Sequence, residues 1–277
     1  MASVDQPQRS TIIFGFDSAW TDSPGTPGAI CAISFDAWGK ARFDEPRLVS
    51  FTGALAYICT LRAGFDVSLV ALDQPTIVPN AAGSRPVDKV AASLVSFIGG
   101  GVQPASRSKI GMFSDDAPIW HFLSALDAIE DAVLARTASA GHFLIEVFPA
   151  LALPAFENDF ARRLGAPKYN PQNRRKFRLE DWRAVIRAVQ VTADRFGIGD
   201  LANWAGGMGA LDKPRKADQD RLDAAICALI GLAWRAGPDA DSVMLGNLRS
   251  GYIVTPVSAA TRPRLEQASR RQGLSLS

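Results

Sequence analysis

Five acidic residues are placed where side chains that do chemistry are expected. Three of them end an apolar run or lie inside one, and the other two are three residues apart in a helical pattern. They are Asp17, Asp73, Glu146, Asp220 and Asp223. Carboxylates that crowd together repel, so they need a proton, a basic partner or a metal ion. Mg²⁺ and Mn²⁺ prefer oxygen ligands, and two such ions can clamp the attacking and leaving oxygens of a phosphodiester.

Each acid also has a simpler interpretation. Asp17 could hydrogen-bond the turn 18–28, which is rich in glycine and proline. Asp220 as a helix N-cap, with Asp223 three residues further on, would satisfy free backbone amides and contribute about 0.5–2 kcal/mol. Only the grouping of the five acids favours a metal site.

The elements that must position these acids follow from apolar patterns. The run 12–16 predicts a strand buried on both faces, and the strands 29–35 and 41–51 follow too closely for a crossover helix, which predicts an antiparallel meander. Further strands are predicted over 67–73, 142–149 and 251–256. Helices are predicted over 52–62 with Thr52 as N-cap, 87–98, 119–139, 179–196 and 218–234. Residues 76–118 have no strong pattern and predict a lid or an insertion, and 197–216 predict a glycine-rich connection.

The composition indicates a soluble globular protein with a sizeable core. Of 277 residues, 47% are hydrophobic and 21% charged, which suits one large domain. The three cysteines are far apart and favour reduced thiols in a cytoplasmic protein. No apolar run approaches the ~20 residues that span a bilayer, and the N-terminus lacks the apolar region of a signal peptide. Two histidines argue against a histidine-rich zinc site.

The charge is distributed unevenly along the chain. Nine basic and two acidic residues lie between 162 and 187, a local net charge of +7 in a chain whose total is +2. Such a stretch can bind a nucleic-acid backbone or can be a solvated helix face. The best candidates for phosphate contacts are Lys168, Arg174, Arg175 and Arg178. Trp20 could stack a base or pack in the core.

The order of these motifs resembles a known family. A strand ending in Asp, a meander, a helix, a second strand ending in an acid and a late Asp-x-x-Asp helix resemble the RNase H-like superfamily, its RuvC-like branch most of all. More closely, the chain resembles domain-of-unknown-function family 429, whose members are predicted RNase H-like nucleases. The matching motifs are Gly15-Phe-Asp17-Ser-Ala-Trp20, Leu72-Asp73-Gln-Pro75, Arg85-Pro-Val-Asp88, Ile145-Glu146-Val-Phe-Pro149, Asp220-Arg-Leu-Asp223-Ala-Ala and Gly251-Tyr-Ile-Val-Thr-Pro256, with Lys168 and the arginines that follow it.

This resemblance implies an α/β fold and a reaction. It implies a single RNase H-like domain over 1–277, with a five-stranded mixed sheet flanked by helices, a core over 11–257, a long insertion near the site at 76–118 and a tail at 258–277. Asp17 would be the first metal ligand, Asp73 or Glu146 would bridge two Mg²⁺ or Mn²⁺ ions, and Asp220 or Asp223 would complete the catalytic site. Arg85 would join the basic residues that bind the substrate. A metal-activated water would attack a backbone phosphate of a nucleic acid and leave a 3′-hydroxyl.

Two other functions stay open at this point. A non-catalytic module that binds nucleic acid or protein would keep the basic stretch but scatter the acids too far apart to share a metal. An actin-like nucleotide-binding ATPase would need a glycine-rich phosphate turn beside Asp17, and the glycines at 25 and 28 are loosely spaced for that role.

Overall fold

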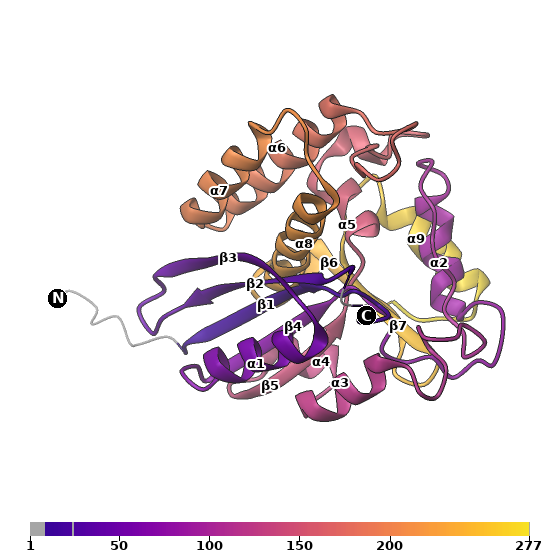
Figure 1. Ribbon diagram of the computed structural model, residues 1–277. Coiled ribbons are helices and arrows are strands. Elements are labelled where there is room, and N and C mark those ends of the chain that lie inside the picture. The colour runs from indigo at the N-terminus through magenta and orange to yellow at the C-terminus, as the bar shows by residue number, and fades with distance from the viewer. Residues whose placement is uncertain (1–8, 24, 277) are drawn as a thin grey trace.

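A five-stranded mixed sheet forms the centre of the protein (Figure 1). The computed structural model describes residues 9–23 and 25–276. The strand order is β3-β2-β1-β4-β5, with β1 to β3 antiparallel and β4 and β5 parallel to β1. The bounds are β1 Thr11–Asp17, β2 Gly28–Phe35, β3 Ala41–Val49, β4 Val67–Leu72 and β5 Gly141–Glu146. The predicted meander is therefore confirmed.

Helices cover both faces of the sheet (Figure 1). On one face Ile13 and Leu69 pack with α8 (Lys216–Ala236), and above it lie α6 (Leu179–Arg195) and α7 (Gly199–Gly209). On the other face Phe14 and Val70 pack with α1 (Phe51–Arg62) and α3 (Pro118–Leu126). Successive strand residues point to opposite faces, so a strand covered on both sides is apolar throughout.

Gly15 lets β1 and α8 approach each other closely. A Cβ at this position would lie 2.0 Å from the carbonyl oxygen of Ala224 and 2.3 Å from the backbone nitrogen of Ala228. Only glycine fits such a backbone contact. The contact lies two residues from Asp17 and one from Asp223, so it holds the two acid-bearing elements together.

A smaller lobe lies beside the end of β5 (Figure 1). Its antiparallel pair consists of β6 and β7, and β7 touches the main chain after β5 through the bridge between Val147 and Val254. The apolar cluster of this lobe joins the pair to α2 and α9. The remaining bounds are α2 Pro86–Val95, α4 Ala132–Thr137, α5 Pro149–Phe156, β6 Ser242–Asn247, β7 Gly251–Pro256 and α9 Arg262–Arg271.

Several predicted boundaries were wrong. Helix α1 begins at Phe51 and is capped by Ser50, whose Oγ accepts from the Gly53 amide, and not by Thr52. The predicted helix 119–139 is two helices, α3 and α4, because Asp127 ends α3 in the left-handed conformation (φ 50°).

Two segments predicted without regular structure are partly helical. The glycine-rich connection 197–216 contains α7, and the tail 258–277 contains α9. In α7 the apolar side chains of Leu201 and Ala205 are buried in the core, and the Trp182 indole of α6 donates to the Met208 carbonyl. Tertiary packing of this kind outweighs the low helix propensity of glycine. Among the described helices, none combines the length and apolarity that a membrane crossing requires.

Candidate functional site

The strand register places two of the predicted acids at one level. Phe16 of β1 pairs with Leu72 of β4, and the amide of Asp73 donates to the Phe16 carbonyl at 2.9 Å. Asp17 and Asp73 follow these paired residues directly. By alternation along the strands, both belong to the face that α8 covers.

Helix α8 brings the third and fourth acids to this level. It begins at Lys216 after the N-cap Arg215, and Asp218 accepts the Arg215 amide at 2.8 Å. Asp220 is therefore not the N-cap, and the capping interpretation of Asp220 and Asp223 was wrong. Both acids lie inside the helix and are buried. We call Asp17, Asp73, Asp220 and Asp223 the acid cluster.

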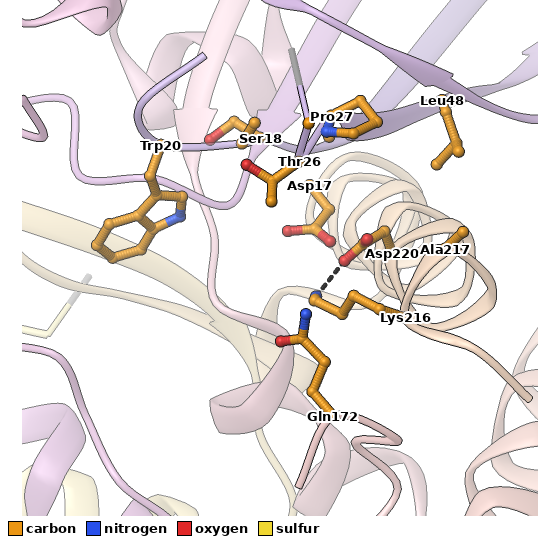
Figure 2. Close-up of a pocket in the computed structure, with 13 residues that line it drawn as sticks. Asp17, Ser18, Trp20, Thr26, Pro27, Leu48, Gln172, Lys216, Ala217 and Asp220 are labelled. Carbon is orange, nitrogen blue, oxygen red and sulfur yellow. Dashed lines mark hydrogen bonds and ion pairs between the residues drawn. The ribbon is translucent and has the colours of Figure 1, made fainter. Parts of the chain in front are cut away.

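A pocket of about 450 Å³ opens onto the acid cluster (Figure 2). Asp17 and Asp220 line it together with Lys216, and Trp20 and Gln172 lie on its rim. The turn 25–28 between β1 and β2 forms part of its wall. Residues from four distant parts of the chain therefore meet at one opening.

The carboxylates in the cluster are close enough to repel one another. Burial first, and then the charges of Asp223 and Asp73, raise the pKa of Asp17 well above its usual range. Burial, and then the charges of Asp223 and Glu146, do the same to Asp73. Burial raises the pKa of Asp223 to about 6, although three polar neighbours oppose this rise. A set of carboxyls that ionise with difficulty favours a cationic ligand.

Three neighbours of the cluster were missed at the level of sequence. The Lys216 ammonium pairs with Asp220 and lowers the pKa of Asp17 and Asp73. The Tyr169 hydroxyl donates to Asp223 Oδ1 at 2.7 Å, and Gln219 Nε2 donates to Asp223 Oδ2 at 2.9 Å. The helical spacing of Lys216 and Gln219 relative to the two acids could have identified them, whereas nothing near Tyr169 indicated its role.

Lys216 supplies the positive charge of the cluster. Within residues 9–23 and 25–276, no three His, Cys, Asp or Glu side chains are arranged to hold a metal ion as they stand. In the same residues, the carboxylates of Asp17 and Asp73 have neither a hydrogen bond nor an ion pair within contact distance. The Lys216 ammonium group therefore offsets part of the repulsion between the carboxylates. The lone pairs of Asp17 and Asp73 are not used by any contact within the described residues.

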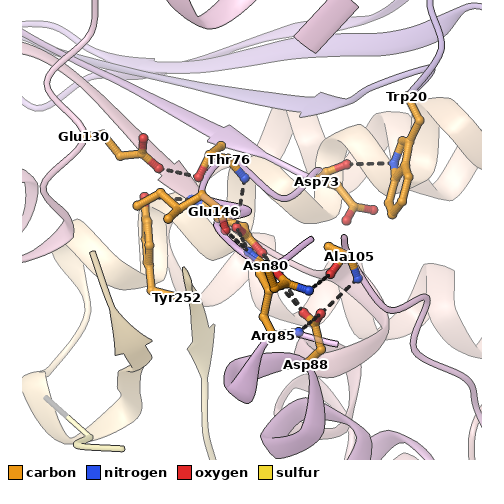
Figure 3. A network of polar contacts seen from close by, with 11 residues as sticks. Trp20, Asp73, Thr76, Asn80, Arg85, Asp88, Ala105, Glu130, Glu146 and Tyr252 are labelled. Atoms are coloured by element: carbon orange, nitrogen blue, oxygen red, sulfur yellow. Dashed lines mark hydrogen bonds and ion pairs between the residues drawn. The ribbon is translucent and has the colours of Figure 1, made fainter. Parts of the chain in front are cut away.

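Glu146 has a different environment from the other four acids (Figure 3). Its carboxylate forms a two-pronged ion pair with Arg85, with Nη1 to Oε2 at 2.8 Å and Nη2 to Oε1 at 2.6 Å, and accepts the Thr76 amide. Arg85 also donates from Nε and Nη2 to Asp88 and from Nη1 to the Ile77 carbonyl. Burial raises the pKa of Glu146, and the charge of Arg85 opposes this rise.

Strand alternation explains this separation. Glu146 pairs with Leu72, which packs on the face of α1 and α3, while Asp73 follows one residue later. The two side chains therefore leave their strands on different faces, but both still line one small cavity beyond the strand ends. Arg85, which we expected to contact the substrate, is 1% exposed with all five of its donors engaged inside the protein. The structure thus gives Glu146 and Arg85 internal partners.

The other predicted substrate-binding residues lie on or beside one loop. Arg174, Arg175 and Arg178 are exposed, and among the described residues they take part in no ion pair. Lys168 is half-buried, and its Nζ donates to the Gly99 carbonyl at 2.7 Å. The loop 165–178 also carries Tyr169 and Gln172, so the exposed arginines are tethered to the acid cluster.

The raised pKa values predict how stability depends on pH. A carboxyl with a higher pKa in the folded than in the unfolded state binds more protons when folded, so it contributes stability that is lost as pH rises. We therefore expect the metal-free protein to unfold at a higher urea concentration at about pH 6.5 than at about pH 8. The groups responsible are Asp17, Asp73 and Asp223, together with Glu146, whose pKa burial raises to about 7.

His142 sets the lowest pH at which this trend in stability can be measured. Burial lowers its pKa to about 4, so it opposes the trend once the unfolded histidine begins to charge. Asp17→Asn should make the pH dependence shallower. A stability that is constant or rises between these two pH values would contradict the predicted crowding.

The comparison with known families identifies the chain. A family model described as a protein of unknown function, DUF429, matches residues 15–244, which contain the whole acid cluster and the Arg85–Glu146 pair. No curated protein and no solved structure matches the chain. The order and spacing of the acid-bearing elements agree with the resemblance found in the sequence, and the match covers most of the chain. The protein belongs to the DUF429 family.

Proposed function

We propose that the protein is a metal-dependent nuclease or phosphodiesterase with an RNase H-like fold that acts on nucleic acid. The acid cluster carries this proposal. Four carboxylates from β1, the end of β4 and α8 repel one another, and Asp17 and Asp73 have no partner among the described residues. Buried carboxylates without a counter-charge lower the stability of the protein. A cation bound at this site would offset that cost.

The arrangement of elements supports the RNase H-like assignment. The antiparallel meander β1-β2-β3, the helix α1, the parallel strand β4 and the late acid-bearing helix α8 occur in the order that the resemblance implies. Asp17 and Asp73 also lie at the carboxyl ends of neighbouring parallel strands, where α/β sheets commonly bind ligands. We treat 76–118 as an insertion near the site, because its residues Val102 and Gln103 line a cavity beside Asp73.

The donors fit Mg²⁺ or Mn²⁺ in kind, since all of them are carboxylate oxygens. Asp17, Asp73, Asp220 and Asp223 would hold the metal. When bound, such a metal activates a water molecule and offsets the negative charge of a phosphate. Metal binding requires the Lys216 ammonium to leave Asp220, and its side chain is 39% exposed, so solvent can receive it. Lys216 then lies beside the opening and can bind a substrate phosphate.

The basic loop supplies the substrate contacts in this proposal. Arg174, Arg175 and Arg178 face solvent on the segment that Tyr169 ties to Asp223. Arginine side chains bind phosphate oxygens in pairs, and such contacts give salt-sensitive affinity for a nucleic-acid backbone. Glu146 and Arg85 remain outside the metal site in this proposal, because each neutralises the other in the core.

A Mn²⁺ titration and a cleavage panel test the proposal. We expect Mn²⁺ to bind at millimolar concentrations or below, and anomalous diffraction from Mn²⁺-soaked crystals to give a peak among Asp17, Asp73 and α8. Single-stranded, duplex and branched nucleic acids should then be tested for Mn²⁺-dependent cleavage. If no ion binds the cluster at millimolar Mn²⁺, the proposed activity is wrong.

One observation favours a second candidate. Because Lys216 already lies in the cluster and no three acids there hold an ion as they stand, a non-catalytic module that binds nucleic acid would retain the basic loop without chemistry. Binding of nucleic acid that is unchanged by Mn²⁺, with no cleavage of any substrate, would favour this candidate.

A further inference from the structure

A second, smaller cavity lies next to the acid cluster. It has a volume of about 140 Å³ and is distinct from the larger pocket, but Trp20 lines both. Asp73 lines the small cavity as well, so one carboxylate of the cluster opens onto it. Gly101 and polar or charged residues form half of the remaining wall, and apolar side chains form the other half, namely Pro75, Val102, Val147, Phe148 and Ile253.

The Trp20 indole is held firmly in its position. Its Nε1 donates to the Asp73 carbonyl at 3.2 Å (Figure 3). Phe113 packs against it with ring centroids 5.5 Å apart. Gln74 Nε2 donates to its backbone carbonyl at 3.4 Å. The backbone of Trp20 adopts the left-handed conformation (φ 51°), which is uncommon for a bulky residue. An aromatic wall fixed in advance is suited to stacking against a planar ring.

The volume of the cavity matches about one ring. A cavity of roughly 150 Å³ in another protein accepts benzene, so about 140 Å³ accommodates a six-membered ring more readily than a fused pair of rings. Charge limits the ligand further. The cavity is lined by the carboxylates of Asp73, Asp88 and Glu146 but by only one cation, Arg85, whose donors are all engaged. This surplus of negative charge disfavours a phosphate or carboxylate in the cavity and admits a neutral or cationic ring.

We infer that this cavity is a binding site for a pyrimidine base, stacked on Trp20, whose nucleotide places its phosphate at the acid cluster. The inference rests on the proposed function, because the neighbouring cluster is what makes a nucleotide the expected ligand. It adds a specificity for one-ring bases to that function. Every base has a face that can stack, so stacking alone does not discriminate, and the discrimination comes from the size of the cavity.

Calorimetric titration with nucleosides tests the inference without metal or cleavage. In the presence of a chelator, we expect cytidine to bind saturably and to shift the indole N–H resonance of Trp20. Adenosine should bind more weakly, and ribose 5-phosphate should not shift this resonance. An absence of cytidine binding, or a shift caused by ribose 5-phosphate, would overturn the inference.

Two variants keep the test decisive. Val102→Phe fills the cavity and should weaken cytidine binding about tenfold or more, whereas Val191→Phe, on the exposed face of α6, should leave it unchanged. Trp20→Leu removes the stacking wall and should also cost about tenfold, which covers the case in which Val102→Phe fails to fold. Unchanged binding in the folded Val102→Phe protein would place the ligand elsewhere and overturn the inference.

The two proposals fail in distinguishable ways. Asp17→Asn should abolish cleavage but retain cytidine binding, because Asp17 does not line the small cavity. Cleavage by the wild-type protein without nucleoside binding would remove the base site and leave the nuclease. Nucleoside binding that is lost in Asp17→Asn would show that the small cavity is not an independent site, which also overturns the inference.

Discussion

Asp17→Asn is expected to reduce Mn²⁺-dependent cleavage at least about a hundredfold and to make the metal-free protein more stable. Loss of a residue that hydrogen-bonds a metal ligand costs about 10–100-fold in metal affinity or activity. Loss of the ligand itself should therefore cost at least as much. The gain in stability has a separate cause. Burial and the repulsion of Asp223 and Asp73 act against the Asp17 carboxylate, and among the described residues no hydrogen bond compensates. An amide of the same size removes that repulsion.

The two effects require different measurements. Cleavage should be followed on the substrate that the panel identifies, and the free energy of unfolding by urea titration at about pH 8 with a chelator present. Asp194→Asn is a matched control, because Asp194 is exposed on α6 and should change neither quantity. A variant that retains cleavage would show that Asp17 is not a catalytic ligand. A loss of stability would show that its carboxylate has a compensating partner.

Arg85→Met is expected to destabilise the protein by about 3–5 kcal/mol. The guanidinium is 1% exposed and bonds to Glu146, Asp88 and the Ile77 carbonyl. Its removal leaves two carboxylates buried without a counter-charge, and the cost of an uncompensated buried charge is the main part of the effect. The measurement is the urea concentration at the unfolding midpoint of the wild-type and variant proteins, with one m-value fitted to both.

A surface arginine and a double variant complete this experiment. Arg183 pairs with Asp212 at 3.3 Å, but these side chains are 44% and 87% exposed, so Arg183→Met should cost no more than about 1 kcal/mol. Adding Glu146→Gln to Arg85→Met should recover part of the loss, because it removes one of the two stranded charges. An effect of Arg85→Met as small as that of Arg183→Met would mean that water reaches the network and solvates it.

Much of the fold could be predicted because local patterns determine it. The apolar run ending at Asp17 and the short connections after it required a buried strand in a meander, and the sheet has both. The alternation that predicts strands does not reveal where a helix breaks. Asp127 divides the predicted helix 119–139 by taking a left-handed conformation. Aspartate adopts this conformation only occasionally, so its presence in an apolar helical pattern does not indicate a break.

Other errors arose where packing outweighed local preference. Four glycines argued against a helix at α7, yet the buried faces of α6 and α7 hold it in place. The start of α8 was predicted two residues too late, at Asp218 and not at Lys216. This error hid Lys216, the cation that lies one turn before Asp220 and pairs with it.

The sequence by itself determined that acids end the central strands and recur on a late helix, because residue type and spacing are local properties. Only the tertiary structure decided which acids meet. Asp73 joins Asp17 because both follow the paired residues Phe16 and Leu72, whereas Glu146 is one residue earlier in register and pairs with Arg85. Side chains alternate with a period of two along a strand, so pairing between strands distant in sequence selects the face of each carboxylate.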